Sequence, residues 1–524
     1  MKQVPKLNRT NLLLLSSSLF SLTSAYATKP KSVDAPNIVY ILCDDLGYGD
    51  VHCLNPERCK ISTPNMDRLR EEGMAFTDCH SSSSVSTPSR YSVLTGRYAW
   101  RTDLQNGVLN GEGKPLIAPD RMTVGNMLQK QGYTTAVIGK WHLGLDYDKI
   151  DFAKPIADGP VQHGFDYFFG IAGSANMQPF VYMENDHFTQ VPTKKKTFPT
   201  FVYGPIPVTK STQTGPAASD YDVIDLVPKI TGKAVDYIDE RAKEKKPFFL
   251  YLSLTSPHCP LVPTKEWQGK SGLGQYGDFV METDWAIGEV LKAIDAAGFA
   301  ENTMVVLTSD NGCAPYVGVH KLEEMGHYPS GEFRGYKSDI WEGGHRVPFI
   351  VRWPAKVKAG SESNQISCMT NLMATCADIL DVKLPDTASE DSYSILPTLL
   401  GKKRTKDEII VNHSINGRFG IRKGKWKLEL CPASGGWGTP NDAAAVKDGS
   451  PTIQLYNIKN DIAEKLNESA KNQKVVKKLT SLLEKYVADG RSTKGEALKN
   501  DVEVDIWKMQ LNEPAKGKKE KEDE

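Results

Sequence analysis

Four continuous apolar runs mark the first two thirds of the chain, and each is followed by polar side chains. The runs are NIVYILC, TTAVIG, FFLYLSL and TMVVLTS. Continuous runs rich in β-branched and aromatic residues are typical of strands buried on both faces of a sheet. The polar residues after them are, in chain order, Asp44 and Asp45, Lys140 and His142, His258, and Asp310 and Asn311.

Amphipathic patterns that end in glycine separate these runs. In TPNMDRLREEG, Thr63 can cap a helix and Pro64 fits its first turn. TVGNMLQKQG and GDFVMETDWAIGEVLKAIDAAG read as helices in the same way. Alternating strands and helices predict an α/β fold with a large, mainly parallel sheet sandwiched by helices. Ligands bind beyond the carboxyl ends of such strands, so we expect the polar groups to meet in one site.

The two ends of the chain are expected to lie outside the fold. A basic start, an apolar stretch over 12–22 and Ala25-Tyr26-Ala27 read as a signal peptide, residues 1–27. The mature chain should begin near Thr28 and be periplasmic or secreted. No later run is apolar enough for stable membrane insertion. The charged tail 511–524 should be disordered.

The pattern of hydrophobic and polar residues divides the remaining chain into two parts. Residues 28–400 carry the alternating pattern and should form the catalytic domain, with a Pro-, Thr- and Lys-rich insert over 174–225. Residues 401–510 read as antiparallel hairpins with glycine turns, followed by the amphipathic helix NQKVVKKLTSLLEKYVADG. They predict a small C-terminal α+β domain with an antiparallel sheet.

Composition narrows the function only slightly. Lys and Arg number 64, as do Asp and Glu, and this balance argues against a nucleic-acid binder. The nine cysteines show no zinc-like spacing. Cys53 and Cys59 could bridge in an oxidising compartment, or be buried free thiols.

Two acidic pairs stand where a metal would bind. Asp44–Asp45 and Asp310–Asn311 offer only oxygen ligands, which calcium or magnesium prefers, whereas zinc would favour histidine or cysteine. An isolated Asp-Asp pair is often a surface turn, but here each pair follows a buried strand. The segment S-T-P-S-R starts a helix in which Ser86 or Thr87 fits the cap and Pro88 the first turn. Ser86 would then lie where helix N–H groups favour an anion. Alone, this segment is no more than a well-capped helix.

These motifs together resemble those of formylglycine-dependent sulfatases. S-x-P-S-R followed by T-G-R is similar to the family signature, in the serine form of bacterial carbohydrate sulfatases. GKWHLG, SPHCP, SDNG, KSDIWEGGHRVP and LYNIKNDIAEKLNES resemble further family motifs in the same order, over about 35–490. The resemblance implies an alkaline-phosphatase-like fold and a sulfuric ester hydrolase of arylsulfatase type.

The resemblance also implies site roles. A maturation enzyme would oxidise Ser86 to formylglycine (3-oxoalanine). One Ca2+ per chain would be held by Asp44, Asp45, modified Ser86, Asp310 and Asn311. Arg90 and Lys140 would neutralise charge around the aldehyde hydrate, and His142 would hydrogen-bond to it. His258 and Lys337 would bind the sulfate, and one of the two would protonate the leaving oxygen.

Sulfate esters explain why such a site is needed. Enzymes acting on comparably slow reactions lower the barrier by on the order of 20 kcal/mol. Fixed positive groups and a cation offset charge on the transferring oxygens. Of the two hydroxyls of an aldehyde hydrate, one attacks sulfur and the other expels sulfate as the aldehyde re-forms.

Two other functions remain open at this point. A phosphoesterase or phosphodiesterase of the same superfamily would use zinc and more histidines. A catalytically silent protein that binds sulfated glycans would have lost part of the site. Glu342-Gly343-Gly344 should be a structural turn and His163 a packing residue, whereas His327 fits either role.

The substrate is expected to be a sulfated carbohydrate of galactose or N-acetylgalactosamine type, from mucin or glycosaminoglycan fragments, cleaved by exo action. The insert carries His187 beside acidic and aromatic residues, a mixture that suits sugar hydroxyls and ring faces. Glu332, five residues before Lys337, is a second candidate for sugar recognition. Both could equally be solvated loop positions.

Overall fold

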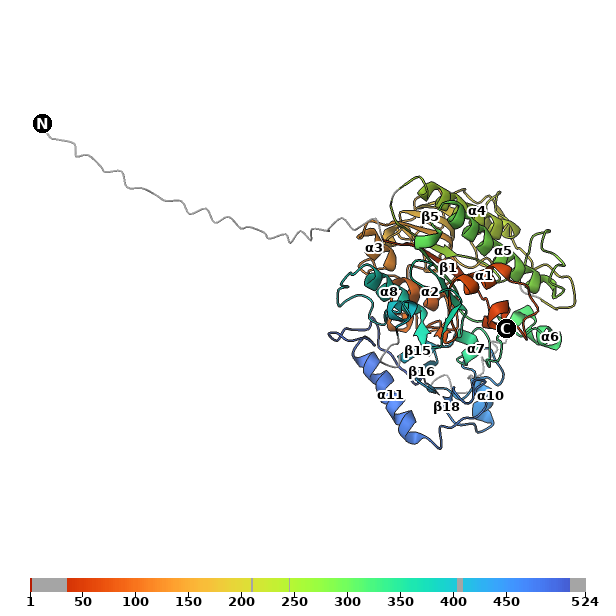
Figure 1. Cartoon of the computed structure of the whole chain (residues 1–524), viewed down its shortest axis with the longest axis vertical. Helices are drawn as coiled ribbons and strands as arrows, with labels where there is room; N and C mark the ends of the chain where they lie inside the picture. Colours follow the sequence, from red (N-terminus) through yellow and green to blue (C-terminus); the bar gives the residue numbers. More distant parts are fainter. Residues whose placement is uncertain (2–34, 209–210, 245, 403–408, 509–524) are drawn as a thin grey trace, which may run out of the picture.

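The computed structural model describes residues 1, 35–208, 211–244, 246–402 and 409–508. The expected signal peptide and the charged tail therefore lie outside the described residues. A ten-stranded sheet forms the centre of the molecule (Figure 1). Its strands, in spatial order, are β13 (Ser361–Ser363), β2 (Met74–Phe76), β12 (Phe349–Arg352), β11 (Thr303–Ser309), β1 (Asn37–Cys43), β10 (Phe248–Ser253), β4 (Thr134–Lys140), β5 (Tyr167–Ile171), β6 (Met183–Glu184) and β7 (His187–Phe188).

The middle of this sheet is parallel. β11, β1, β10, β4 and β5 run in one direction, and β12 pairs antiparallel with β11. These five strands are buried almost throughout, which is why their sequences are continuously apolar. The expected α/β fold is confirmed.

Helices cover both faces of the sheet (Figure 1). One group packs α1 (Pro64–Glu72) and α4 (Leu226–Arg241) against α5 (Gly274–Ala296). The other group packs α2 (Ser86–Thr95) and α3 (Val124–Gln129) against α8 (Leu372–Ile379). Shorter helices are α6 (Val319–Glu324), α7 (Glu342–His345), α9 (Leu396–Leu399) and α10 (Asp442–Lys447).

The start of α2 differs from expectation, whereas that of α1 agrees with it in position. α2 begins at Ser86 itself, with Val85 in the cap position, so neither Ser86 nor Thr87 is the cap. In α1, Thr63 takes the expected cap position and Pro64 the first turn, although the Thr63 hydroxyl donates to the Asp67 carboxylate instead of accepting from the helix backbone. The Ser86 hydroxyl is therefore free to face the end of the sheet.

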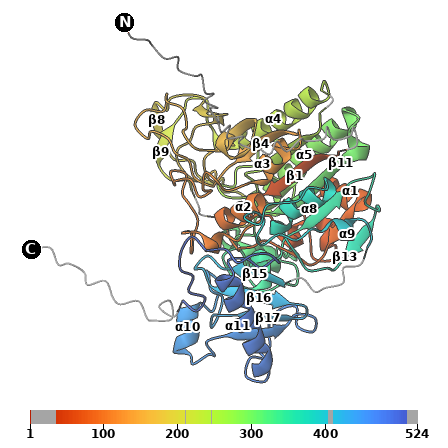
Figure 2. The same cartoon turned by 90° about the vertical axis from the view of Figure 1, so that its left-hand side faces the viewer.

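A second sheet lies below the first (Figure 2). It contains β15 (Ile409–His413), β16 (Phe419–Lys423), β17 (Trp426–Glu429) and β18 (Gln454–Asn457), all antiparallel, and α11 (Gln473–Ala488) packs on it. The insert carries β6, β7 and the hairpin of β8 (Lys194–Lys196) with β9 (Gly215–Ala217). The short strands β3 (Cys79–His80) and β14 (Ser367–Cys368) form a further pair. Cys53 and Cys59 are free thiols and do not bridge.

Candidate active site

The polar residues that follow the four apolar runs meet at one edge of the sheet. β11, β1, β10 and β4 are adjacent, and Cys43 is level with Ser309 while Leu42 is level with Ser253. Asp44 and Asp310, the next residues of β1 and β11, therefore leave the sheet side by side. α2 brings Ser86 to the same place. The expectation that one site collects these groups is confirmed.

Ser86 lies at the centre of this cluster and is 2% exposed. Its Oγ is 3.3 Å from Oδ1 of Asp44, 3.3 Å from Nζ of Lys140 and 3.5 Å from Oδ1 of Asn311. The hydroxyl thus sits between an anion, a cation and an amide. Chemistry at this side chain would take place in a nearly water-free environment, where electrostatic interactions are strong.

Three carboxylates face three cations around Ser86. Lys140 Nζ is 2.9 Å from both carboxylate oxygens of Asp44. Arg90 donates to Oδ2 of Asp310 through Nε at 3.0 Å and Nη2 at 2.7 Å. Lys337 Nζ is 2.7 and 2.8 Å from the two oxygens of Asp45. Because all six groups are buried, each charge depends on its partner to remain ionised.

The pKa values of the cluster reflect this balance. Burial raises the pKa of Asp44 to about 7 against the opposing effect of Lys140. Burial together with the Arg90 charge lowers the pKa of Lys140 to about 8. Burial alone would raise the pKa of Asp310, but Arg90 and Lys140 outweigh it and lower that pKa to about 2. Lys337 likewise holds the pKa of Asp45 below its ordinary value despite burial.

Two histidines complete the site in the neutral form, because burial lowers the pKa of both His142 and His258 well below the ordinary value. His142 Nε2 lies 2.8 Å from the Leu109 carbonyl oxygen, so it must be the protonated nitrogen. His142 Nδ1 is then a buried acceptor with no partner among the described residues. His258 Nδ1 lies 2.6 Å from the Cys259 carbonyl oxygen, which leaves its Nε2 unprotonated and 3.7 Å from Asp45.

The donor set fits a hard divalent cation. Asp44, Asp45 and Asp310 offer carboxylate oxygens, and Asn311 turns Oδ1 toward Ser86 while its Nδ2 donates to Asp45. Ligand atoms of Asp44, Asp45 and His258 lie within 4.8 Å of one another. Oxygen-rich sets of this kind are typical of calcium or magnesium sites. The histidine supplies one nitrogen, fewer than a structural or catalytic zinc site usually has.

The structure does not bring His187 to this cluster. β7 is the edge strand, five strands from β1, which corresponds to roughly 24 Å at the usual strand spacing. The His187 side chain is 55% exposed and contacts Asp186 at 2.7 Å. This position gives the expected sugar contact of His187 no structural support.

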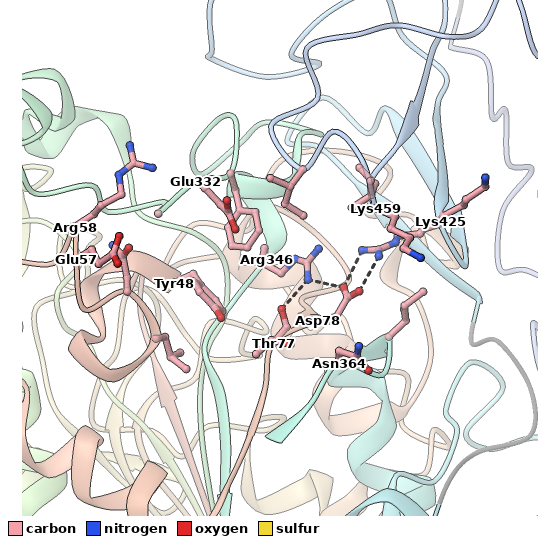
Figure 3. A pocket seen from close by; sticks show the side chains of 18 of the residues that line it. Tyr48, Glu57, Arg58, Thr77, Asp78, Glu332, Arg346, Asn364, Lys425 and Lys459 are labelled. Atoms are coloured by element: carbon pink, nitrogen blue, oxygen red, sulfur yellow. Dashed lines mark hydrogen bonds and ion pairs between the residues drawn. The ribbon is translucent and has the colours of Figure 1, made fainter. Parts of the chain in front are cut away.

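Glu332 also lies away from the cluster around Ser86. It lines an open cleft of about 1090 Å³ that contains none of the residues around Ser86 (Figure 3). The chain between Glu332 and Lys337 turns, and the two side chains part: Lys337 reaches Asp45, while Glu332 lies in the cleft with Tyr48 and Arg346 (Figure 3). Its expected role in reading the sugar at Ser86 is likewise without structural support.

The remaining sequence candidates have structural partners. His163 Nε2 lies 2.8 Å from the Asp158 carboxylate, and its ring stacks on Trp141. His327 Nε2 lies 2.8 Å from Asp50, which places this histidine in the supporting structure. A Cβ on Gly343 would lie 2.1 Å from the Gly335 carbonyl oxygen, so this turn requires glycine for close packing.

Two contributors to the site have no signature in the sequence. Tyr316 donates its hydroxyl to Oδ2 of Asp45 at 2.8 Å, and its ring lies edge-on to His258. Ser253, the last residue of β10, accepts from Arg90 Nη1 at 2.5 Å and donates to the Lys140 carbonyl oxygen at 2.6 Å. Only the position of Ser253 at a strand end could have suggested its role.

Comparison with known proteins decides the family. The profile of the sulfatase family matches residues 36–382, well over half of the chain. The chain belongs to the sulfatase family. This sulfatase is 36% identical over 489 residues to an N-acetylgalactosamine-6-O-sulfatase of Bacteroides thetaiotaomicron, with 86% of this chain and 92% of the relative covered. It is 30% identical to human arylsulfatase A, with 85% and 86% covered.

Solved structures agree with this assignment. A protein structure reported with the metabolism of multiple glycosaminoglycans by Bacteroides thetaiotaomicron superposes with a TM-score of 0.76 at 33% identity, covering 86% of this chain and 99% of that chain. The sulfatase described here is therefore a sulfuric ester hydrolase with the fold of bacterial carbohydrate sulfatases. Within the described residues, no helix combines the length and apolar character needed to cross a membrane.

Proposed function

We propose that this sulfatase removes 6-O-sulfate groups from N-acetylgalactosamine or galactose units at the ends of sulfated glycan fragments. The observation that carries the proposal is the similarity over nearly the whole length to an N-acetylgalactosamine-6-O-sulfatase at 36% identity. The mouse N-acetylgalactosamine-6-sulfatase is also 31% identical over 443 residues, with 81% of this chain covered. Mucin or glycosaminoglycan fragments would supply such esters.

The reacting group is proposed to be formylglycine, formed from Ser86 by a maturation enzyme. The hydrate of this aldehyde would supply a hydroxyl that takes the sulfuryl group and a second hydroxyl whose deprotonation releases it. The position of Ser86 supports the modification, because its side chain points from the first turn of α2 into the charged cluster. An unmodified serine would be left as a stable sulfate ester.

The surrounding side chains would act as follows. Lys140, 3.3 Å from Ser86 Oγ, stabilises negative charge on the reacting oxygen. Arg90, held against Asp310 by two hydrogen bonds, keeps that carboxylate ionised. His142 offers its unpaired Nδ1 as acceptor for a hydroxyl on residue 86.

Protonation of the leaving oxygen falls to His258 or Lys337. Lys337 is charged: burial alone would lower the pKa of its ammonium group, but the carboxylates of Asp45, Asp44 and Asp310 together outweigh burial and raise it. His258 is neutral with Nε2 unprotonated, so it would first have to take up a proton, which a bound sulfate anion beside it would favour. Both groups flank Asp45 and can reach the same ester.

A calcium ion and export complete the proposal. Asp44, Asp45, Asp310 and Asn311 would hold Ca2+ together with modified residue 86, and the ion would supply Lewis-acid polarisation of the sulfate oxygens. Residues 1–27 would direct the chain to the periplasm or the medium and be removed near Thr28. Edman sequencing of the exported protein tests the cleavage, and Met1 on the mature chain would contradict it.

The substrate is tested by free sulfate released from a panel of esters. We expect the highest kcat/KM for N-acetylgalactosamine 6-sulfate and galactose 6-sulfate, with much slower release from the 4-sulfates and from glucose-configured 6-sulfates. A steryl sulfate and an aryl sulfate belong in the panel, because human steryl-sulfatase is 30% identical. A phosphate monoester tests the phosphoesterase alternative. Equal rates on galacto- and gluco-configured esters would overturn the proposed sugar preference.

A further inference from the structure

A loop of the C-terminal region reaches into the segment that carries Lys337. The Ile340 backbone N–H donates to the Ser434 carbonyl oxygen at 2.7 Å. The Trp437 N–H donates to Oγ of Ser338 at 2.8 Å, and the Gly438 N–H donates to Oδ1 of Asp339 at 2.8 Å. Three successive residues after Lys337 therefore hold this loop, residues 434–438, in place.

Glycine makes this close approach feasible. A Cβ on Gly436 would lie 2.3 Å from the Ser338 carbonyl oxygen, and one on Gly438 would lie 2.5 Å from Asp339. Any larger residue would push the loop away from the segment beneath it. The hydroxyl of Ser434 closes the turn by donating to the Gly438 carbonyl oxygen at 3.0 Å. The loop 434–438 is thus built to sit at a fixed distance from Lys337.

The loop carries a large aromatic side chain, Trp437, that is unusually exposed to solvent. Trp437 is 46% exposed, whereas Trp100, Trp141 and Trp341 are almost completely buried. Large aromatic side chains gain most when they are covered, and an indole combines a flat apolar face with a polar edge. A half-exposed tryptophan on a rigid loop is well suited to contact a ligand.

The loop also lies next to the reacting centre. The Ser338 N–H, adjacent to Lys337, donates to the Ser84 carbonyl oxygen at 2.8 Å, two residues before Ser86. Lys337 itself contacts Asp45. The residue that fixes the Trp437 backbone thus also contacts the chain that leads into Ser86. The loop 434–438 is therefore joined through Ser338 both to the segment that carries Lys337 and to the chain that leads into Ser86.

We propose that Trp437 forms the sugar subsite of the enzyme, with its indole face against the ring that bears the sulfate ester. This inference rests on the proposed function for the identity of the sugar. A galacto-configured ring has an axial 4-hydroxyl, so the C–H groups of its opposite face form a continuous apolar surface. That surface is complementary to the flat face of the indole. A gluco-configured ring has an equatorial 4-hydroxyl, and its face is less complementary to the indole.

Binding without turnover provides the test. Titration calorimetry is done in the Ser86→Ala background with N-acetylgalactosamine 6-sulfate and, separately, with inorganic sulfate. We expect Trp437→Ala to weaken binding of the sugar about tenfold, the magnitude typical of losing an aromatic contact, and to leave sulfate affinity unchanged. Trp437→Phe should restore most of the affinity. Trp426→Ala is the matched control, since Trp426 lies on β17 under Lys425 and should not affect either ligand.

The outcomes separate this inference from the proposed function. Unchanged sugar affinity in Trp437→Ala overturns the subsite. Equal losses for the sugar and for inorganic sulfate also overturn it, because they would mean that the loop only positions Lys337. If the parent protein does not bind N-acetylgalactosamine 6-sulfate, the proposed function fails. The same titrations with the best ester from the substrate panel then decide the role of Trp437.

Discussion

The ammonium group of Lys140 lies 2.9 Å from both carboxylate oxygens of Asp44, and neither residue is exposed to solvent. The same ammonium is 3.3 Å from the hydroxyl of Ser86. One cation therefore contacts two groups: it lowers the pKa of the Asp44 carboxyl against the effect of burial, and in the proposed mechanism it would stabilise charge on residue 86. Catalysis and stability should be difficult to separate at this position.

Replacing Lys140 by alanine should lower both properties. The variant leaves Asp44 buried without its partner, a change that typically costs about 3–5 kcal/mol of unfolding free energy. Sulfate release should fall by about 100-fold or more, as when a preorganised charge-stabilising donor is removed. Urea unfolding and a sulfate-release assay measure the two effects. Lys233→Ala, which removes a solvent-exposed pair with Glu184, is the control and should cost about 1 kcal/mol or less. Full activity in Lys140→Ala would contradict the assigned role.

Maturation of Ser86 should be visible by mass. The tryptic peptide that ends at Arg90 should lose two hydrogens when the protein is produced with a maturation enzyme that accepts serine. Ser86→Ala should keep its melting temperature and lose all turnover, because Oγ makes only contacts of 3.3 Å or longer. Ser92→Ala on the same helix removes a hydroxyl that bonds to the Pro88 carbonyl oxygen, and it should stay active. Turnover in Ser86→Ala would refute the mechanism.

Metal content is the third expectation. Active protein should contain one equivalent of calcium by elemental analysis, and chelation should lower both activity and the melting temperature, because a ligand that binds only the folded state stabilises it. Asp310→Ala should lose metal and activity together. Asp284→Asn is a control, since this buried carboxylate accepts from the backbone N–H groups of Asn65 and Met66 at the start of α1. Stoichiometric zinc without calcium would favour the phosphoesterase alternative.

Glu282 on α5 should make stability depend on pH. Burial raises its pKa to about 7 against an ordinary value near 4.5, and its Oε1 has no hydrogen-bond partner among the described residues. A raised folded-state pKa gives stability that is complete below the unfolded pKa and is lost as pH rises through 7. Glu282→Gln, which cannot ionise, should gain up to about 3 kcal/mol over the wild type between pH 5 and pH 8.

Chemical unfolding at several pH values measures this difference. The comparison is made between variants, because other buried groups titrate in the same range. Glu289→Gln on the same helix removes a surface pair with Lys292 and should leave the pH dependence unchanged. A constant difference between wild type and Glu282→Gln over this range would show that Glu282 is ionised throughout.

Arg101 connects distant parts of the chain and should be important for stability. It donates to both oxygens of Asp391 at 2.8 Å and to the Tyr486 carbonyl oxygen at the end of α11 at 3.0 Å. Arg101→Ala should cost about 3–5 kcal/mol, because it leaves a buried carboxylate unpaired. The exposed pair of Lys154 with Asp148 gives the control, and Lys154→Ala should cost about 0.5 kcal/mol or less. A loss as small as the control's would contradict this role.

The sequence predicted the fold best where burial on both faces of the sheet produces a recognisable hydrophobic pattern. β1 and β11 are parallel and covered on both faces, so their sequences are continuously apolar and their ends reveal Asp44 and Asp310. The start of α2 was misplaced because hydroxyl side chains are preferred as caps, whereas Val85 takes that position. The local preference of a residue for the cap position does not show which residue of the first turn will face the sheet.

Contacts between distant segments were beyond the reach of such patterns. Polar and aromatic neighbours made His187 a plausible sugar contact, but pairing places β7 at the edge of the sheet. Glu332 is close to Lys337 in the chain, yet the turn between them sends it to another cleft. Tyr316 and Trp437 carry no motif, because their positions depend on how loops from different parts of the chain meet.

The position of the loop 434–438 means that substrate preference and hydrolytic chemistry depend on different parts of the chain. The groups that would perform the chemistry stand on the central sheet and on α2, within the span matched by the family profile, whereas this loop lies outside that span. Its contacts with 338–340 are mostly made by backbone groups on the loop side, so the residue at 437 can change without disturbing the buried charges. A lineage could therefore acquire a new sugar preference by drift at a single loop position while the hydrolytic machinery stays under strict selection.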